Sequence, residues 1–240
     1  MMNEAADIEQ ETGRIRVILV EDHPMFRERL TMLINKDLGM VVCAEADNTR
    51  TAMTLIQREK PDVAIVDITL QGTSGLELIK DIKAQGITMP VLVLSMHEET
   101  LYAERVLRAG ARGYIMKSEA SSEVVKAIKR VVAGDVYLSG KMTAQVLDRM
   151  SQRKPVESKN AELLTDRELE VFHLIGSGKT TREIAQQLVL GETTVETYRA
   201  RIKEKFGLRN AVELSQAATR WLVERDGTAK RNGAPPTEGL

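Results

Sequence analysis

Five polar or charged residues directly follow short apolar segments in the first half of the chain, and their types suit metal and phosphate chemistry. They are Glu21, Asp22, Asp67, Ser95 and Lys117. If the apolar segments are strands of one parallel sheet, these side chains meet at the carboxyl edge of that sheet. Carboxylates held close together repel one another, so such a cluster needs a cation. An all-oxygen ligand set with room for water predicts Mg²⁺.

A carboxylate beside Mg²⁺ and a lysine can attack a phosphoryl group and form an aspartyl phosphate. Lys117 would then offset charge on the transferred oxygens, and Ser95 would donate a hydrogen bond to them. Two competing phosphate sites fit less well. A phosphatase with an aspartate nucleophile needs a second Asp two residues further on, where this chain has Thr69. A flavin-phosphate loop is rich in Ser, Thr and Gly, whereas the acidic sequence EDHP after the first apolar run repels phosphate without a metal.

The segments that must position these residues alternate between two patterns from residue 15 to about residue 133. Segments with a helical spacing of apolar residues separate short apolar runs, which predict buried parallel strands. The runs are Ile15–Val20, Met40–Ala44, Val63–Val66, Val91–Leu94 and Gly113–Met116. Right-handed crossovers place the helices on both faces of the sheet. The predicted fold is a doubly wound α/β domain over residues 15–135, with a five-stranded parallel sheet.

Only helical patterns follow the α/β domain, and they predict a small all-α domain over residues 163–225. A linker is expected at residues 136–162. Its first part has spacing compatible with a helix over Ser139–Met150, and its second part, Ser151–Asn160, is polar and contains Pro155. Disordered tails are expected at residues 1–14 and 226–240, the latter because it is rich in Gly and Pro.

Composition excludes several classes of protein. The chain has 240 residues, 42% of them hydrophobic and 29% charged, which is enough apolar surface for a core. Its apolar runs are too short to span a bilayer, and the polar first 14 residues do not resemble a secretory signal. A single cysteine, Cys43, fits a reducing compartment, so we expect a cytoplasmic protein without membrane contact. The net charge of −1 means that any nucleic-acid binding must come from a local patch.

Such a patch lies in the helical domain. Thr165 and Glu168 form the sequence of a capping box at the start of its first helix. A short helix over residues 180–188, a tight turn with Gly191 and a longer helix over Glu192–Phe206 then give a helix-turn-helix pattern. Basic residues gather on one edge of the longer helix and short side chains on its outward face, a pattern typical of major-groove binding. The candidate DNA contacts are Thr193, Thr194, Glu196, Thr197, Arg199, Ala200, Arg201, Lys203 and Lys205.

Residues 15–133 resemble the receiver domain of bacterial two-component response regulators through VILVEDHPMFRERL, VAIVDITLQGTSGLELI, VLVLSMH and AGARGYIMKSE. The resemblance implies that Asp67 is the phosphoacceptor. Glu21, Asp22, Asp67 and the backbone carbonyl of Thr69 would bind Mg²⁺. Ser95 and Tyr114 match the switch pair of the family, and Lys117 matches its invariant lysine. The chain departs from the family at Gln71, where Pro is usual, and at Met96, where a small residue is commoner.

Residues 163–222 resemble the LuxR/NarL-type DNA-binding domain through LTDRELEVFHLI and KTTREIAQQLVLGETTVETYRARIKEKFGLRNAVEL. Together with a receiver, this is the NarL/FixJ type of response regulator. The resemblance implies that Glu192–Phe206 is the recognition helix. It also implies a cognate sensor histidine kinase as phosphodonor, promoter DNA as target and a homodimer on phosphorylation. Gly191 replaces the usual Ser before the helix, and Glu196 stands where several relatives have Lys.

Two functional classes remain open from the sequence. The favoured one is a phosphorylation-controlled transcription regulator that binds promoter DNA as a dimer. It is not a dedicated enzyme, although it accepts a phosphoryl group and can lose it again. The alternative is a phosphorelay or protein-interaction module whose helical domain docks a protein. Salt-dependent binding to duplex DNA distinguishes the two.

Overall fold

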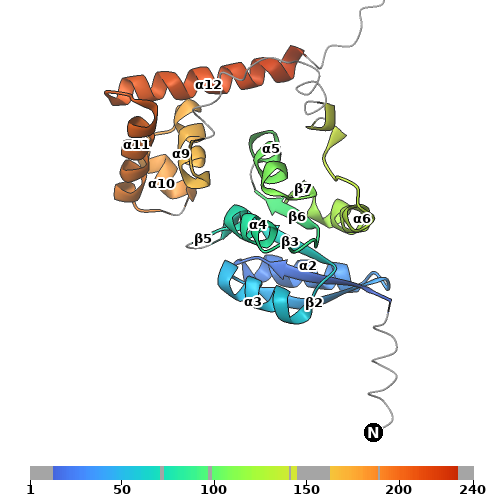
Figure 1. Cartoon of the computed structure of the whole chain (residues 1–240). Coiled ribbons are helices and arrows are strands. Elements are labelled where there is room, and N and C mark those ends of the chain that lie inside the picture. Colours follow the sequence, from blue (N-terminus) through green and yellow to red (C-terminus); the bar gives the residue numbers. More distant parts are fainter. Residues whose placement is uncertain are drawn as a thin grey trace, which may run out of the picture. The chain divides into compact units, whose positions relative to one another are not determined.

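Five parallel strands form one sheet in the first half of the chain, in the order β2-β1-β3-β6-β7 (Figure 1). The strands are β1 (Ile15–Val20), β2 (Met40–Ala46), β3 (Val63–Asp67), β6 (Val91–Ser95) and β7 (Gly113–Met116). Residues in the middle of the sheet are buried, as are all five residues of β3 and of β6, because helices cover both faces. The predicted doubly wound fold with a five-stranded parallel sheet is confirmed.

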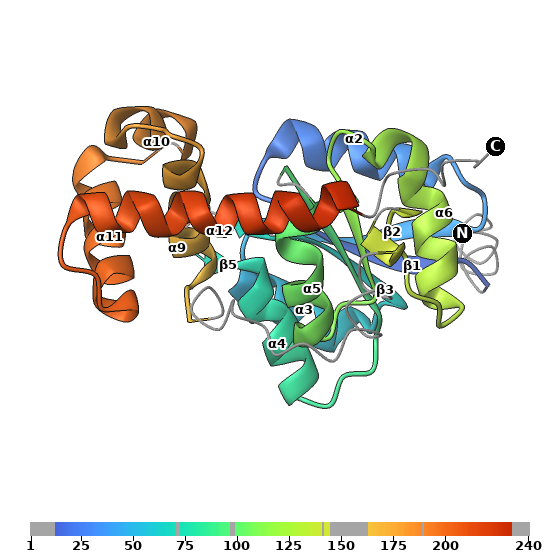
Figure 2. The same ribbon diagram turned by 90° about the horizontal axis from the view of Figure 1, so that it is seen from above.

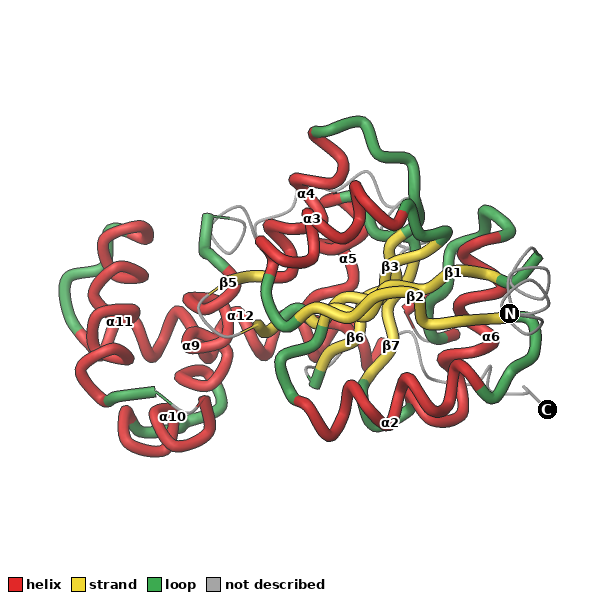
Figure 3. The backbone as a smooth tube through the Cα atoms, turned by 90° about the horizontal axis from the view of Figure 1, so that it is seen from below, coloured by secondary structure: helices red, strands yellow, loops and turns green. Residues whose placement is uncertain are grey.

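Helices pack on the two faces of this sheet in groups of two and three (Figure 3). On one face lie α2 (Pro24–Asn35) and α6 (Ala120–Val132). On the other lie α3 (Thr49–Glu59), α4 (Gly75–Ala84) and α5 (Glu99–Ala109). Under α2 and α6, the side chains of Leu19, Ile65 and Leu94 pack in one core with Ile34 and Ile128. Burying these aliphatic side chains stabilises the arrangement that brings the strand ends together.

Strands β3 and β6 each run one residue further than the sequence pattern predicted. Asp67 pairs with Leu94 in the ladder, and the N–H of Ile68 donates to the carbonyl of Leu94 at 3.3 Å. Asp67 and Ser95 are therefore the last residues of their strands, where the backbone fixes the direction of each side chain.

A small antiparallel hairpin follows Asp67 and had no signal in the sequence. It consists of β4 (Thr69–Leu70) and β5 (Thr73–Ser74) and returns the chain to Gly75. The N–H of Gly75 donates to the carbonyl of Ile68 at 2.9 Å. A Cβ atom at position 75 would lie 2.0 Å from the carbonyl oxygen of Asp67, so only glycine allows this approach.

The structure is a computed structural model, and it describes residues 13–70, 73–96, 99–140, 142–144, 163–188 and 190–231. The chain divides into two compact units, Met1–Val146 and Leu147–Leu240. The expected linker Ser151–Asn160, almost all of the expected N-terminal tail and Gln71 lie outside the described residues. Residues 140 and 142–144 are helical, and the rest of the helix expected up to Met150 also lies outside them.

The second unit contains α9 (Asp166–Gly176), α10 (Thr181–Leu188), α11 (Glu192–Phe206) and α12 (Ala211–Arg231), with α12 packed along α9 (Figure 2). The predicted capping box of α9 is present: Thr165 N–H donates to the Glu168 carboxylate at 2.7 Å, and Glu168 N–H donates to the Thr165 hydroxyl at 3.4 Å. Phe172 lies at the centre of this unit, with its ring 5.1 Å from that of Phe206 and 5.4 Å from that of Trp221.

The predicted start of the C-terminal tail at residue 226 is too early, because α12 continues to Arg231. Residues 228–231 (TAKR) are compatible with a helix, and the breakers of the tail begin only at Gly233. Gly227 is tolerated inside the helix at a cost of about 1 kcal/mol relative to Ala. Among the described residues, no helix is both long and apolar enough to cross a bilayer.

Candidate functional site

Strand register brings the predicted site residues to one edge of the sheet. Val20 pairs with Val66 and Ser95 pairs with Met116, so the ends of β1, β3, β6 and β7 lie side by side. Glu21 and Asp22 follow β1, and Lys117 follows β7. The backbone N–H of Lys117 donates to the carbonyl of Ser95 at 2.8 Å, which fixes the start of the lysine side chain beside β6.

Lys117 is the centre of the site. Its Nζ lies 2.8 Å from Oδ2 of Asp67 and 2.7 Å from Oε2 of Glu21. All three side chains are at least 95% buried. The ring of Phe26 lies 4.8 Å from the ammonium, measured to its centroid, and adds a cation–π contact. The lysine is thus held between two carboxylates with little access to water.

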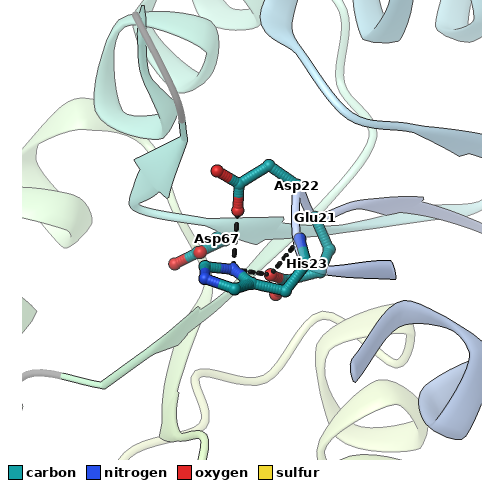
Figure 4. Close-up of side chains that lie close together, drawn as sticks. All are labelled: Glu21, Asp22, His23 and Asp67. Atoms are coloured by element: carbon teal, nitrogen blue, oxygen red, sulfur yellow. Dashed lines mark hydrogen bonds and ion pairs between the residues drawn. The ribbon is translucent and has the colours of Figure 1, made fainter. Parts of the chain in front are cut away.

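Asp22 and His23 lie beside Glu21 and Asp67, with the His23 ring directed at the carboxylates of Asp22 and Glu21 (Figure 4). Nδ1 of His23 is 2.7 Å from Oδ1 of Asp22 and 2.9 Å from Oε1 of Glu21. The His23 side chain is 64% exposed, whereas the Asp22 side chain is 6% exposed. The imidazole therefore lies between the solvent and the carboxylates of Glu21 and Asp22.

Backbone contacts fix the orientation of the carboxylates. The N–H of Thr69 donates to Oδ1 of Asp67 at 3.1 Å, which leaves Oδ2 toward Lys117. The guanidinium of Arg27 donates to the backbone carbonyl of Glu21 at 2.6 Å and pairs with Glu45 at 3.0 Å. Arg27 and Phe26 were missed from the sequence. Their spacing on α2 gives no signal, because the contacts depend on how that helix is rotated against the strand ends.

The pKa of Asp67 is raised to about 6. Burial is the largest cause, and the charge of Glu21 adds to it, while Lys117 acts in the opposite direction. Burial also disfavours the charged form of Lys117, but the two carboxylates outweigh it and raise the pKa of the lysine. One buried ammonium is thus shared by two carboxylates.

This donor set fits a hard divalent cation such as Mg²⁺. One ligand atom from each of Glu21, Asp22, His23 and Asp67 can be chosen so that all lie within 4.8 Å of one another. The three acids supply only oxygen ligands, which Mg²⁺ prefers, and two of them, Glu21 and Asp67, share the single ammonium of Lys117.

Ser95 and Tyr114, the predicted switch pair, lie on neighbouring strands and are both buried. Ser95 ends β6 next to the strand that carries Asp67, and Tyr114 pairs with Val93 across the β6–β7 ladder. The structure therefore places the hydroxyl at the site edge and the aromatic ring two positions below it in the neighbouring strand.

The predicted recognition helix is α11, with the expected bounds Glu192–Phe206. Its inward stripe contains Val195 and Ile202, which are fully buried. Most of the candidate DNA contacts lie on its exposed side: Thr193, Thr194, Glu196, Thr197, Ala200 and Arg201, with Arg199 and Lys203 partly exposed. The Glu196 carboxylate accepts a hydrogen bond from the Thr181 hydroxyl at 2.7 Å and lies 3.5 Å from Nε of Arg199.

Lys205 differs from the other candidate contacts because its ammonium is bound inside the unit. Its Nζ lies 2.6 Å from the carboxylate of Glu168 and donates to the backbone carbonyl of Leu163 at 3.0 Å. Burial acts to raise the pKa of Glu168, but hydrogen bonds from Lys205 and Thr165 outweigh it and lower that pKa. Lys205 therefore joins the end of α11 to the start of α9, and its contact with DNA stays a prediction.

Two family models match the chain. Residues 17–129 match the response regulator receiver domain, and residues 162–218 match the bacterial regulatory proteins of the luxR family. One match lies within each of the two units described above.

Individual relatives extend over both matches. A putative transcriptional regulator of Pseudomonas aeruginosa is 36% identical over 205 residues, covering 85% of this chain and 97% of that protein. The virulence factors putative positive transcription regulator BvgA of Bordetella pertussis is 32% identical, with the same coverage.

Solved structures share the fold. A LuxR-family two-component response regulator from Aurantimonas is 32% identical, with a TM-score of 0.54 over 58% of this chain and 99% of that one. RcsB of Salmonella enterica, bound to the promoter rprA with the phosphomimetic BeF₃⁻, is 21% identical, with a TM-score of 0.54 over 86% of this chain and 98% of that one.

Affinity for Mg²⁺ should depend on pH through Asp67. Because a proton and the cation compete for a carboxylate whose pKa is about 6, the dissociation constant should be constant above about pH 7. Below pH 6 it should rise by up to about tenfold per pH unit. Isothermal titration calorimetry between pH 5 and 8 measures this, with Asp67→Asn as the control that lacks the step. A wild-type affinity unchanged down to pH 5 would contradict the assignment.

Replacing Lys205 by Met should destabilise the second unit. The expected loss is about 2 kcal/mol, below the roughly 3–5 kcal/mol for breaking a fully buried pair, because the lysine side chain is 33% exposed. Urea unfolding followed by fluorescence of Trp221, the single tryptophan, reports on this unit.

The matched control for Lys205→Met is Lys203→Met, which removes the same charge from the same helix. Because the pKa of Glu168 is lowered, the contribution of the pair is complete above the ordinary value of 4.5 and is lost as pH falls through the lowered pKa. The difference between Lys205→Met and wild type should therefore shrink in acid. Equal stability of the two variants at neutral pH would show that the pair has no structural role.

Proposed function

The chain belongs to the response regulators that join a receiver domain to a LuxR-type DNA-binding domain, and we propose that phosphorylation of Asp67 controls its binding to promoter DNA. The observation that supports this most is the buried Asp67 carboxylate, ion-paired with Lys117 at 2.8 Å beside Glu21 and Asp22. A purely structural ion pair between Asp67 and Lys117 would not require further acids around it. A phosphoacceptor requires them, because they bind the cation that phosphoryl transfer needs.

In the proposed transfer, a carboxylate oxygen of Asp67 attacks the phosphorus of a phosphohistidine on the sensor kinase. The new O–P bond forms as the P–N bond breaks, and the kinase imidazole leaves and takes up a proton. Glu21, Asp22, Asp67 and the carbonyl of Thr69 would hold Mg²⁺, which would supply positive charge to offset the charge on the transferring oxygens. Thr69 N–H orients the Asp67 carboxylate during the approach.

Lys117 and Ser95 would bind the new phosphoryl group. When Asp67 becomes an acyl phosphate, Lys117 loses one carboxylate partner and gains phosphoryl oxygens in its place. Ser95, buried at the end of the neighbouring strand, would donate its hydroxyl to another of these oxygens. The ring of Tyr114 would then fill the space that Ser95 leaves, which gives the receiver two states.

DNA would bind to the exposed side of α11. Arg199, Arg201 and Lys203 would contact phosphates, and Thr193, Thr194, Glu196, Thr197 and Ala200 would face base edges in the major groove. RcsB, a protein with the same fold, was solved on a promoter with a phosphomimetic. We propose that this chain likewise binds promoter DNA, as a homodimer with two half-sites.

A phosphorelay module without DNA output is the weaker alternative. The luxR-family match over residues 162–218 and the exposed helix α11 favour DNA as the partner of the second unit. The receiver would have no dedicated enzymatic activity beyond accepting the phosphoryl group and losing it by hydrolysis.

A small phosphodonor such as acetyl phosphate, with Mg²⁺, should label the protein once, on Asp67. Intact-mass spectrometry should show the mass of one phosphoryl group, and the label should be absent from Asp67→Asn or after chelation of the metal. Asp62→Asn, which changes an exposed acid just before β3, is the matched control and should be labelled like wild type. Persistent labelling of Asp67→Asn would contradict the proposed phosphoacceptor.

Replacing Arg201 or Lys203 by Ala should weaken binding to all duplex sequences. Each lost phosphate contact should reduce the slope of log K against log salt by about one unit. Fluorescence anisotropy at several salt concentrations measures this slope. Arg58→Ala removes the same charge from α3 of the receiver and should leave the slope unchanged. If the Arg58 variant and the α11 variants behave alike, α11 is not the DNA-binding surface.

Phosphorylation should convert the protein from monomer to dimer and increase its affinity for DNA. The second half-site contact is made within one complex, so affinity rises without any new kind of contact. Light scattering and anisotropy on the same samples, with and without acetyl phosphate, test both changes. An unchanged mass together with an unchanged affinity would rule out dimerisation as the route of control.

A further inference from the structure

The segment after α6 adds to the edge of the sheet instead of leaving the receiver at once. The N–H of Tyr137 donates to the carbonyl of Arg112, and the N–H of Tyr114 donates to the carbonyl of Tyr137, both at 2.9 Å. These bonds form a parallel bridge between Gly113 and Tyr137 at the outer edge of β7. We call residues 136–139 the linker clamp. Its backbone is bonded directly to the switch residue Tyr114.

Gly113 makes this approach possible. A Cβ atom at position 113 would lie 2.9 Å from the carbonyl oxygen of Tyr137 and 2.8 Å from a methyl group of Leu92. Any other residue would therefore force the clamp away from β7 or disturb the core under it. Gly113 thus lets the Tyr137 carbonyl come close to β7, and this is the same carbonyl that accepts the hydrogen bond from Tyr114 N–H.

The side chain of Tyr137 fixes the clamp on α6. It is 8% exposed, and its hydroxyl donates to the carboxylate of Glu123. Burial, with the nearby Glu123, raises the pKa of Tyr137 to about 12, so the phenol remains a neutral donor. Lys126 and Arg130 lie 6.0 and 5.9 Å from its ring centroid and cover it from the solvent side.

The end of the clamp is bonded to α5. The N–H of Ser139 donates to Oε1 of Glu99 at 2.8 Å, and the Ser139 hydroxyl accepts from the N–H of Met142 at 3.2 Å. Glu99 is the first residue of α5, the helix that follows the strand ending at Ser95. One short segment thus contacts β7, which carries Tyr114, and the start of α5, the helix that follows the strand carrying Ser95.

We propose that Glu99 and Tyr137 are positioning residues that hold the start of the interdomain linker in the unphosphorylated protein, and that phosphorylation of Asp67 breaks the bond between Glu99 and Ser139. This inference rests on the function proposed above. Movement of Ser95 toward the phosphoryl group draws the start of α5 with it, and movement of the Tyr114 ring shifts the edge of β7. Ser139, bonded to one element and next to the other, cannot follow both. The linker is released and the DNA-binding unit is freed to pair.

The affinity of the full-length protein for a duplex site, measured with and without acetyl phosphate, tests the clamp. Glu99→Ala and Ser139→Pro each remove one side of the bond between these residues. The matched controls are Glu104→Ala, on the same helix, and Ser139→Ala, which keeps the backbone N–H. Unphosphorylated Glu99→Ala and Ser139→Pro should bind DNA at least about fivefold more tightly than wild type, within the usual range of coupling. Their phosphorylated affinities should match wild type.

The ratio of the phosphorylated to the unphosphorylated DNA affinity shows whether the clamp or the proposed function is wrong. If wild type responds to phosphorylation and Glu99→Ala behaves like Glu104→Ala, the clamp is wrong and the proposed function stands. An equal change in both phosphorylation states would also overturn the clamp. If wild type itself does not respond, the proposed function fails and the clamp fails with it.

Hydrogen exchange on wild type gives a test without any substitution. The amides of Tyr137 and Ser139 should be protected in the unphosphorylated protein, and the Ser139 amide should exchange at least about tenfold faster after phosphorylation. Equal exchange of the Ser139 amide in the two states would overturn the proposal even if a variant failed to fold.

Discussion

Lys117 is one buried ammonium that faces the carboxylates of Glu21 and Asp67, and most of the receiver serves to keep it there. The parallel register brings the ends of β1, β3 and β7 together, and Gly75 lets the chain pass close under Asp67. Burial of Asp67, together with the charge of Glu21, outweighs Lys117 and raises the pKa of Asp67 to about 6, and Asp22 brings a further carboxylate to the same place. A cation relieves this imbalance, whereas the phosphoryl group adds negative charge and so increases the need for the cation and for Lys117. The same charges that destabilise the empty site therefore favour its chemistry.

The chain has a net charge of only −1, so any attraction to DNA must come from a local group of basic residues in the second unit. Basic residues on α11 serve two purposes. Lys205 stabilises the unit through Glu168, whereas Arg201 and Lys203 leave their charges toward solvent. In the proposed function, DNA affinity depends on the side chains of α11 that are not used internally. Pairing of two units on phosphorylation would raise that affinity.

Sequence reasoning found the strand-end residues because parallel strands obey a simple rule: whatever follows each strand lies at the same edge. It placed Asp67 and Ser95 one residue outside their strands, since ladder pairing with neighbouring strands extends β3 and β6. It also found α11 to the residue, from the turn at Gly191 and the stripe through Ile202. It missed contacts that depend on how elements pack. Phe26 under Lys117 and Tyr137 on the edge of β7 have no local signal, and the role of Lys205 becomes evident only once α9 and α11 are in place.

The central claim is that burial and the charge of Glu21 outweigh Lys117 at Asp67, so that the site favours a cation, and a titration of the Asp67 carboxyl carbon by ¹³C NMR tests it most directly. In metal-free protein the account predicts a midpoint near pH 6, and saturating Mg²⁺ should move that midpoint down. A metal-free midpoint at the ordinary aspartate value of 3.8, unaffected by Mg²⁺, would contradict it. Asp67 would then be an ordinary partner of Lys117, and the site would not require a cation.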